Sequence, residues 1–152
     1  MEAGRLAEEL ALALAVMDFP GPDFACLWRD DFLDSERMEI RKLGVLADID
    51  VWNVARNAPE LFVEVKAQKV VRRRAQAPFY LSVGEWRSYK RALKAMIPYQ
   101  VWLFQYRDLT HFTEARDQVE LVVFSEIRDG WLDPDGYLVT PESGYGERHR
   151  IK

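Results

Sequence analysis

Cysteine, histidine and long apolar runs are all scarce in this chain of 152 residues. The single cysteine, Cys26, excludes an intramolecular disulfide and fits a reducing compartment. The two histidines lie far apart in the sequence and show no zinc-ligand spacing. The apolar run at 10–17 is too short to span a membrane, and acidic Glu8 and Glu9 precede it where a secretion signal would carry basic residues. We therefore expect a cytoplasmic protein.

Apolar and aromatic residues are plentiful enough for a folded core. They make up 49% and 12% of the chain, and its length is that of one domain. The net charge of −4 argues against a general nucleic-acid binder, yet residues 66–94 hold nine basic side chains and one acidic one. Such a local field can bind phosphate groups on an acidic protein. The alternative is a basic face that only contacts solvent.

The sequence pattern predicts an α/β fold with a mixed central β-sheet and a helix on each side. Helices are expected at Glu2–Met17 and from a capping box at Ser82 and Glu85 to about Met96. Strands are expected at 24–32, 45–54, 61–68, 99–106 and 119–124, with the second and third forming an antiparallel hairpin. We place the main domain at residues 1–128 and a tail, either a small hairpin or a flexible arm, at residues 129–152.

Four charged residues interrupt the strands of the predicted hairpin. Asp48 and Asp50 share one face of the first strand, and Glu64 and Lys66 share one face of the second. A charge inside a sheet is costly unless it is paired or binds a metal. An exposed ion pair on an edge strand is the simpler explanation for Glu64 and Lys66, and a solvent-facing position is the simpler one for Asp48.

Carboxylates that converge on one point form an oxygen-ligand site for Mg²⁺ or Mn²⁺. A nearby lysine can hold the attacking water or stabilise negative charge on a phosphoryl group. These parts suit hydrolysis of a phosphodiester, and the basic stretch after the hairpin would hold the polyanion. For that second role we predict Arg72, Arg73, Arg74, Lys90 and Arg91.

The hairpin residues also carry a family resemblance. Asp50 followed by Glu64-Val65-Lys66 resembles the signature of the PD-(D/E)XK nuclease superfamily, although Ile49 stands where that signature has proline. The opening stretch Gly4-Arg5-Leu6-Ala7-Glu8 is similar to the superfamily's first helix. The segment from Phe79 to Trp86, with the later strand ending at Tyr106, resembles the branch related to the C-terminal domain of the plant protein NO VEIN.

This resemblance implies a restriction-endonuclease-like core and assigns roles to individual residues. Asp50 and Glu64 become ligands of Mg²⁺ or Mn²⁺, with Asp48 as the competing ligand. Lys66 becomes the catalytic lysine, Glu8 an outer helper, and Gln68 a contact to metal-bound water or phosphate. Independently of the resemblance, the capping-box pattern is the preferred explanation of Glu85.

Two functional hypotheses follow. The first is a metal-dependent nuclease that cleaves DNA, with RNA as the second choice, in defence, repair or recombination. The second is a catalytically inactive nuclease-fold module that binds nucleic acid or protein within a larger complex. A helicase or ATPase partner and a homodimer are compatible with both.

Overall fold

Six strands form the central sheet of the computed structural model, which describes residues 2–28, 43–70, 79–127, 132–133, 136–139 and 146–151. Their order is β1-β2-β3-β5-β6-β9, and only the β3–β5 pair is parallel. These strands are β1 (Phe24–Trp28), β2 (Ile49–Asn53), β3 (Ala58–Lys69), β5 (Tyr99–Tyr106), β6 (Glu120–Phe124) and β9 (Gly146–Arg150). The sheet is therefore mixed, as the sequence pattern predicts.

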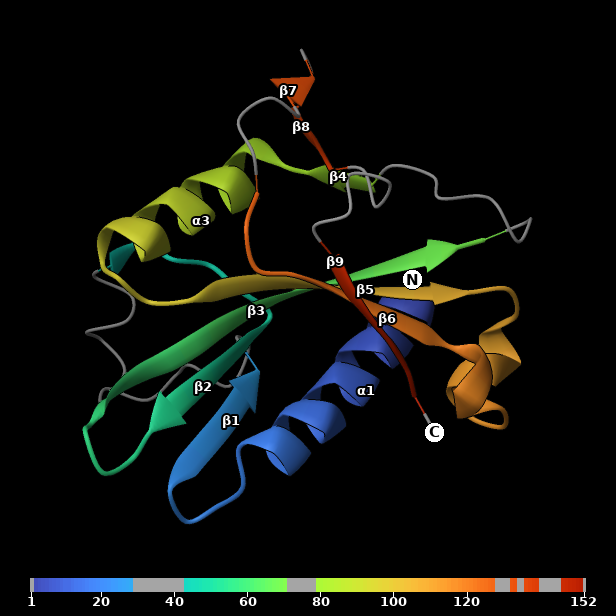
Figure 1. Cartoon of the computed structure of the whole chain (residues 1–152), viewed down its shortest axis with the longest axis horizontal. Helices are drawn as coiled ribbons and strands as arrows, with labels where there is room; N and C mark the ends of the chain where they lie inside the picture. The colour runs from blue at the N-terminus through green and yellow to red at the C-terminus, as the bar shows by residue number, and fades with distance from the viewer. Residues whose placement is uncertain are drawn as a thin grey trace.

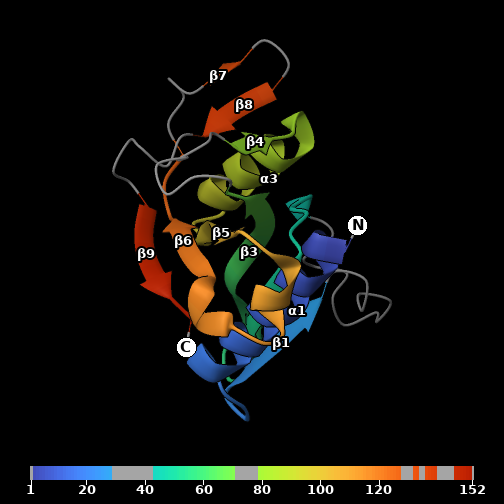
Figure 2. The ribbon, with the colours of Figure 1, turned by 90° about the vertical axis from the view of Figure 1, so that its right-hand side faces the viewer.

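Two helices cover opposite faces of this sheet (Figures 1 and 2). Helix α1 (Glu2–Asp18) buries Ala7, Leu10 and Ala11 against the face that carries Val63 and Val65. On the other face, helix α3 (Val83–Lys94) buries a second set of residues, including Trp86, Tyr89 and Ala92, against Phe62, Val101 and Leu103. Because strand side chains alternate between faces, β3 and β5 contribute to both cores.

The predicted elements are confirmed, with small shifts at their ends. Ser82 caps α3 by accepting a hydrogen bond from the Glu85 amide, and the Glu85 carboxylate accepts one from the Ser82 amide. The predicted hairpin is β2 paired antiparallel with β3, and a register shift lies between Val51 and Trp52. The first strand of that hairpin begins at Ile49 rather than Val45. Of the strand expected at 24–32, the part after Trp28 lies outside the described residues.

The described parts of the C-terminal segment contain three strands. Strands β7 (Leu132–Asp133) and β8 (Gly136–Val139) form a small second sheet with β4 (Phe79–Leu81), in the order β4-β8-β7. Strand β9 pairs antiparallel with β6 and forms one edge of the central sheet. Two short 3-10 helices, η3 (Leu109–Phe112) and η4 (Arg116–Gln118), connect β5 to β6. The central sheet therefore includes β9 from near the C-terminus, and α1 from near the N-terminus packs against it.

We expect Gly146→Ala to lower the free energy of unfolding by about 1–3 kcal/mol, the usual cost of overpacking. A Cβ atom at Gly146 would lie 2.4 Å from the Val122 side chain, so β9 could not pair with β6 in its present position. Gly4→Ala is the matched control, because nothing lies within 4 Å of its Cβ position and alanine favours α1. Urea unfolding should show a gain of up to about 1 kcal/mol for this control. Equal stability of both variants would contradict the β6–β9 pairing.

Among the described residues, no helix combines the length and apolar character that a membrane span requires.

Candidate active site

Strand β3 directs Glu64 and Lys66 toward α3. Their neighbours Val63 and Val65 face α1, so the alternation of the strand fixes this direction. Glu64 is only 7% exposed, and its carboxylate lies 3.7 Å from the Lys66 ammonium. The simple explanation of an exposed edge-strand ion pair is wrong, because β3 lies between β2 and β5 in the middle of the sheet.

Asp48 directly precedes β2 and lies close enough to Glu64 for its charge to raise the pKa of that carboxyl. The paired residues of the hairpin include Asp50 with Phe62 and end with Ile49 and Val63. The Asp48 amide donates to the Val63 carbonyl at 3.0 Å, and its Oδ2 atom accepts from the Val65 amide at 2.8 Å. These contacts place the Asp48 carboxylate within electrostatic reach of Glu64.

Asp50 is the more deeply buried of the two aspartates. It is 4% exposed in β2 and lies one cross-strand position further along the hairpin, opposite Phe62 and Leu27. Its side chain shares the face of Glu64, because residues two apart on a strand point the same way. The predicted roles of Asp48 and Asp50 as metal ligands both stay predictions, with Asp48 in the closer position.

Glu85 joins the same cluster from the first turn of α3. Its carboxylate oxygens lie 2.8 and 2.5 Å from Lys66 Nζ, and one of them also accepts the Ser82 amide of the capping box. Glu85 therefore does more than cap the helix, which was the only role the sequence suggested. The capping pattern explained Glu85 fully at the sequence level, so no signal for a second role remained. Only the packing of α3 on β3 reveals it.

The environment separates the proton affinities of the two glutamates. Burial raises the pKa of Glu64 to about 10, with further contributions from its hydrogen bond to Glu85 and from the charges of Asp48 and Glu85. Burial would also raise the pKa of Glu85, but its hydrogen bonds with Glu64, Lys66 and the Ser82 amide lower it below its usual value. Near neutral pH these shifts favour a protonated Glu64 and an ionised Glu85.

Tyr99 closes this cluster from the start of β5. It is 3% exposed, and its pKa is raised well above the usual value by burial and by the nearby negative charges of Glu64, Glu85 and Asp48. Its hydroxyl makes no hydrogen bond of good geometry with a described residue, although it lies close enough to Glu64 for the two groups to affect each other's proton affinity. No sequence pattern singles out Tyr99, which has the features of an ordinary core residue.

The other predicted catalytic residues lie on two different elements. Gln68 is on β3, on the same face as Lys66, and its side-chain oxygen accepts a hydrogen bond of 2.8 Å from Gln105. Glu8 is half-buried on α1, the helix that covers the opposite face of the sheet. To act as a helper, the Glu8 side chain would have to reach the cluster past the end of β3. This role of Glu8 stays a prediction.

The predicted nucleic-acid-binding residues are only partly described. Lys90 and Arg91 are exposed on α3, with the Lys90 ammonium 4.9 Å from the centre of the Trp86 ring and Arg91 donating to the Gly44 carbonyl. Both contacts are within the protein and leave the predicted role open. Arg72, Arg73 and Arg74 lie outside the described residues.

The cluster has donors of the type that Mg²⁺ and Mn²⁺ prefer, since Asp48, Glu64 and Glu85 all offer carboxylate oxygens. As the side chains stand, however, no three Asp, Glu, His or Cys residues within the described ranges are arranged to hold a metal ion. The Lys66 ammonium lies against both glutamates instead. A bound cation would need the proton of Glu64 to leave, and the carboxylates of Asp48, Glu64 and Glu85 would then offer it oxygen ligands.

We expect Asp48→Asn to weaken Mn²⁺ binding by at least about tenfold, the scale seen when groups around a metal are altered. Asparagine keeps an oxygen that can accept from the Val65 amide, so the hairpin should stay intact. Asp50→Asn is the matched control, because Asp50 shares the face but lies one cross-strand position away. Titration calorimetry with Mn²⁺ measures both. A larger loss for Asp50→Asn would assign the ligand to Asp50 instead.

Comparison with known proteins supports the fold. No protein-family profile matches this sequence, and no curated protein matches it. Among solved structures, the chain is similar to Hjc from Archaeoglobus fulgidus, a Holliday junction resolvase from an archaeal hyperthermophile. The similarity covers 91% of this chain and 90% of that one, with a TM-score of 0.50 and 19% sequence identity. Hjc belongs to the PD-(D/E)XK nuclease superfamily, and the present chain has the same restriction-endonuclease-like fold class.

Proposed function

We propose that this protein is a metal-dependent nuclease that hydrolyses phosphodiester bonds of DNA. One observation carries the proposal: Asp48, Glu64 and Lys66 meet on one face of a β-hairpin, in the middle of a restriction-endonuclease-like sheet. The fold similarity to a Holliday junction resolvase favours DNA over RNA. The NO VEIN-related branch and a role in defence, repair or recombination remain finer predictions.

In this proposal the carboxylates of Asp48 and Glu64 hold Mg²⁺ or Mn²⁺, with Asp50 as the alternative ligand. The bound ion would supply Lewis-acid polarisation of the phosphoryl oxygen and a more acidic water. Glu64 must first release its proton, since only the ionised carboxylate binds a metal well. Glu85, already ionised beside Lys66, can take part in holding the ion or keep Lys66 in place.

Lys66 has the catalytic role that requires a positive charge. Its ammonium can orient the attacking water and stabilise the negative charge that builds on the phosphoryl oxygens. Its position is set by β3 on one side and by the ion pair with Glu85 on the other. The neighbouring carboxylates are buried, so the dielectric constant around them is low. A low dielectric constant strengthens the interactions of the Lys66 ammonium with water and with the phosphoryl oxygens.

The test is a cleavage assay with purified protein in Mg²⁺, Mn²⁺ or EDTA. Substrates are a four-way DNA junction, linear duplex DNA, single-stranded DNA and RNA of matched length. We expect metal-dependent cleavage of DNA and none by a folded Glu64→Gln variant. Absence of cleavage on every substrate, or equal cleavage by the variant, would contradict the proposal.

The inactive module is the second candidate, and one observation favours it. Lys66 and Glu85 form a close ion pair of 2.5 Å while the pKa of Glu64 is raised to about 10, so these three side chains balance their own charge without any metal. A module that only binds a partner needs no metal. Mn²⁺ titration separates the candidates, because equal and negligible binding by the unmodified protein and by Glu64→Gln would favour the inactive module. A helicase or ATPase partner and a homodimer stay predictions under either candidate.

A further inference from the structure

A polar cavity of about 380 Å³ lies where the C-terminal ends of β5 and β9 meet the start of β6. Its walls combine cationic, amide and imidazole groups. The residues that matter for its chemistry are Gln105, Arg107, His111, Gln118, Arg148 and Arg150. None of the predicted site residues lines it. A polar cavity with converging arginines is typical of a site for an anionic ligand.

The register connects this cavity to the candidate active site. Gln68, on the same face of β3 as Lys66, pairs with Gln105 of β5, and Gln105 pairs with Glu120 of β6. Glu120 in turn pairs with Arg150 of β9. Directly paired residues point to the same face of a sheet. One row of polar side chains therefore runs across the sheet from the cluster at Lys66 to the arginines of β9.

Charge in the cavity is unevenly balanced. Three arginines line it against two acidic residues, Asp117 and Glu120. Arg148 donates to Glu120 at 3.1 Å, which fixes its position, whereas neither Arg107 nor Arg150 forms an ion pair with a described residue. These two guanidinium groups keep their planar sets of donors for a ligand.

Two further polar groups lie in the wall. The Nδ1 atom of His111 is buried and has no hydrogen-bond partner among the described residues. Gln105 is 6% exposed and is held in position by its hydrogen bond to Gln68. A buried polar atom without a partner is costly unless a ligand or water completes it. The cavity is larger than a single phosphate needs, so it has room for the sugar or base that accompanies one.

From the usual spacings of residues and strands, the Arg150 position lies roughly 15 Å from the Lys66 position along this row. We infer that the cavity is a second binding site, which holds a backbone phosphate and its nucleotide a few units from the bond at the candidate active site. This inference rests on the proposed function. Arg107 and Arg150 bind the phosphate, Arg148 supports them from its pair with Glu120, and His111 contacts the sugar or base.

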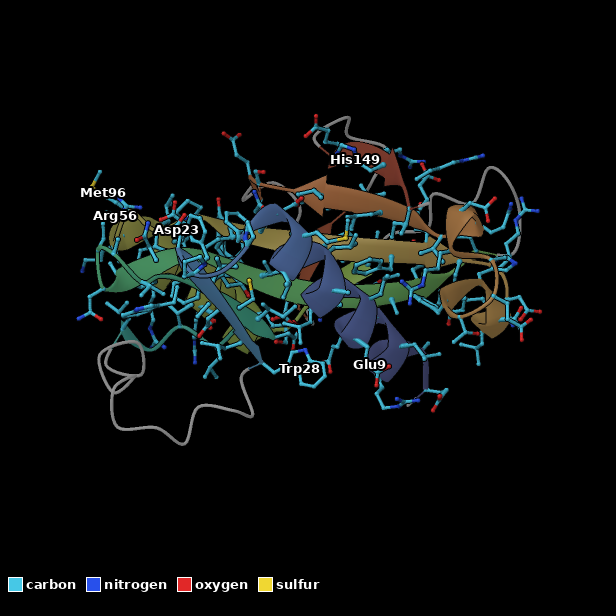
Figure 3. All side chains as sticks on the ribbon, turned by 90° about the horizontal axis from the view of Figure 1, so that it is seen from below. Glu9, Asp23, Trp28, Arg56, Met96 and His149 are labelled. Atoms are coloured by element: carbon cyan, nitrogen blue, oxygen red, sulfur yellow. The ribbon has the colours of Figure 1, made fainter. Side chains whose placement is uncertain are left out.

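The experiment measures binding without cleavage. Fluorescein-labelled single-stranded and duplex DNA of about 20 nucleotides is titrated in EDTA with the unmodified protein and with Arg148→Ala/Arg150→Ala. The control is Arg5→Ala/Arg56→Ala, which also removes two positive charges. Arg5 is on α1, and Figure 3 shows Arg56 well apart from His149, the residue between the two cavity arginines. We expect a loss of affinity of about tenfold or more, and a salt dependence of log Kd reduced by about 1 to 2, only for the cavity variant.

Equal losses in both double variants, no loss in the cavity variant, or no binding by the unmodified protein would overturn the inference. A mononucleotide and inorganic phosphate are titrated in parallel. If the cavity variant loses mononucleotide binding but keeps DNA binding, the site serves a free nucleotide and the inference is wrong. Because the assay needs no metal, its outcome is independent of the cleavage test. A protein that never cleaves DNA but needs the cavity to bind it contradicts the proposed function alone.

Discussion

Replacing Lys66 by methionine is expected to reduce DNA cleavage by about 10²–10³-fold while Mn²⁺ binding is kept. Methionine keeps an apolar side chain of similar length but removes the ammonium that is proposed to stabilise the negative charge on the phosphoryl group. Removing one such stabilising group typically lowers the rate of catalysis by a factor of this size. The metal would lose no ligand. Coulomb's law predicts that Mn²⁺ binds somewhat more tightly, because a competing cation beside Glu64 and Glu85 is gone.

Lys69→Met is the matched control for Lys66→Met. Lys69 is on the same strand and exposed, but it lies three residues further on and therefore on the other face. Its replacement should change cleavage by no more than about twofold, since surface charges of this kind contribute little. Single-turnover cleavage and Mn²⁺ calorimetry are measured for both variants, with far-ultraviolet circular dichroism to show that each is folded. Loss of Mn²⁺ binding together with cleavage in Lys66→Met would mean that Lys66 builds the site rather than acting in the chemistry.

The sequence predicts which side chains of β3 point to each face of the sheet, because successive side chains of a strand alternate between the two faces. Leu61, Val63 and Val65 must face one core, and this alone sends Glu64 and Lys66 to the other side. The capping box was equally readable, because it is made within four consecutive residues. Both predictions depend only on local chemistry, and both are confirmed.

Contacts between distant segments were not readable in the same way. Which aspartate faces Glu64 depends on the register of the hairpin, and this register shifts within β2, between Val51 and Trp52. Glu85 reaches Lys66 only because α3 packs over β3. No local sequence pattern indicates this packing. Likewise, β9 joins the sheet through pairing with β6, where Gly146 leaves space for Val122 and Phe124.

The second large effect concerns stability rather than activity. Without metal, the unmodified protein is expected to become less stable as pH rises from about 6 to 9. Glu64 has a pKa of about 10 in the folded state and an ordinary value of 4.5. Across this window the folded protein therefore holds a proton that the unfolded chain has released. Raising the pH then favours unfolding, with a slope approaching about 1.4 kcal/mol per pH unit from this group alone.

Glu64→Gln should remove most of this slope and should be more stable than the unmodified protein at pH 8. The glutamine amide can donate to Glu85 as the protonated carboxyl does, but it has no proton to lose. Glu60→Gln, on the same strand near its surface partner Arg56, serves as the control and should keep the original slope. Urea unfolding in EDTA at several pH values measures all three proteins. Parallel curves for the unmodified protein and Glu64→Gln would show that Glu64 is already ionised in the free protein.

The same proton links stability to metal binding. If Mn²⁺ must displace it, the affinity for Mn²⁺ should rise by up to about tenfold for each pH unit between 6 and 8, because one proton is released per ion bound. Glu64→Gln should show neither this rise nor measurable binding. A buried glutamate kept neutral by its surroundings would thus lower the stability of the free protein at alkaline pH and supply the ligand that the proposed reaction needs. A site whose Mn²⁺ affinity is flat across this range would contradict the assignment of Glu64 as the ligand that loses a proton.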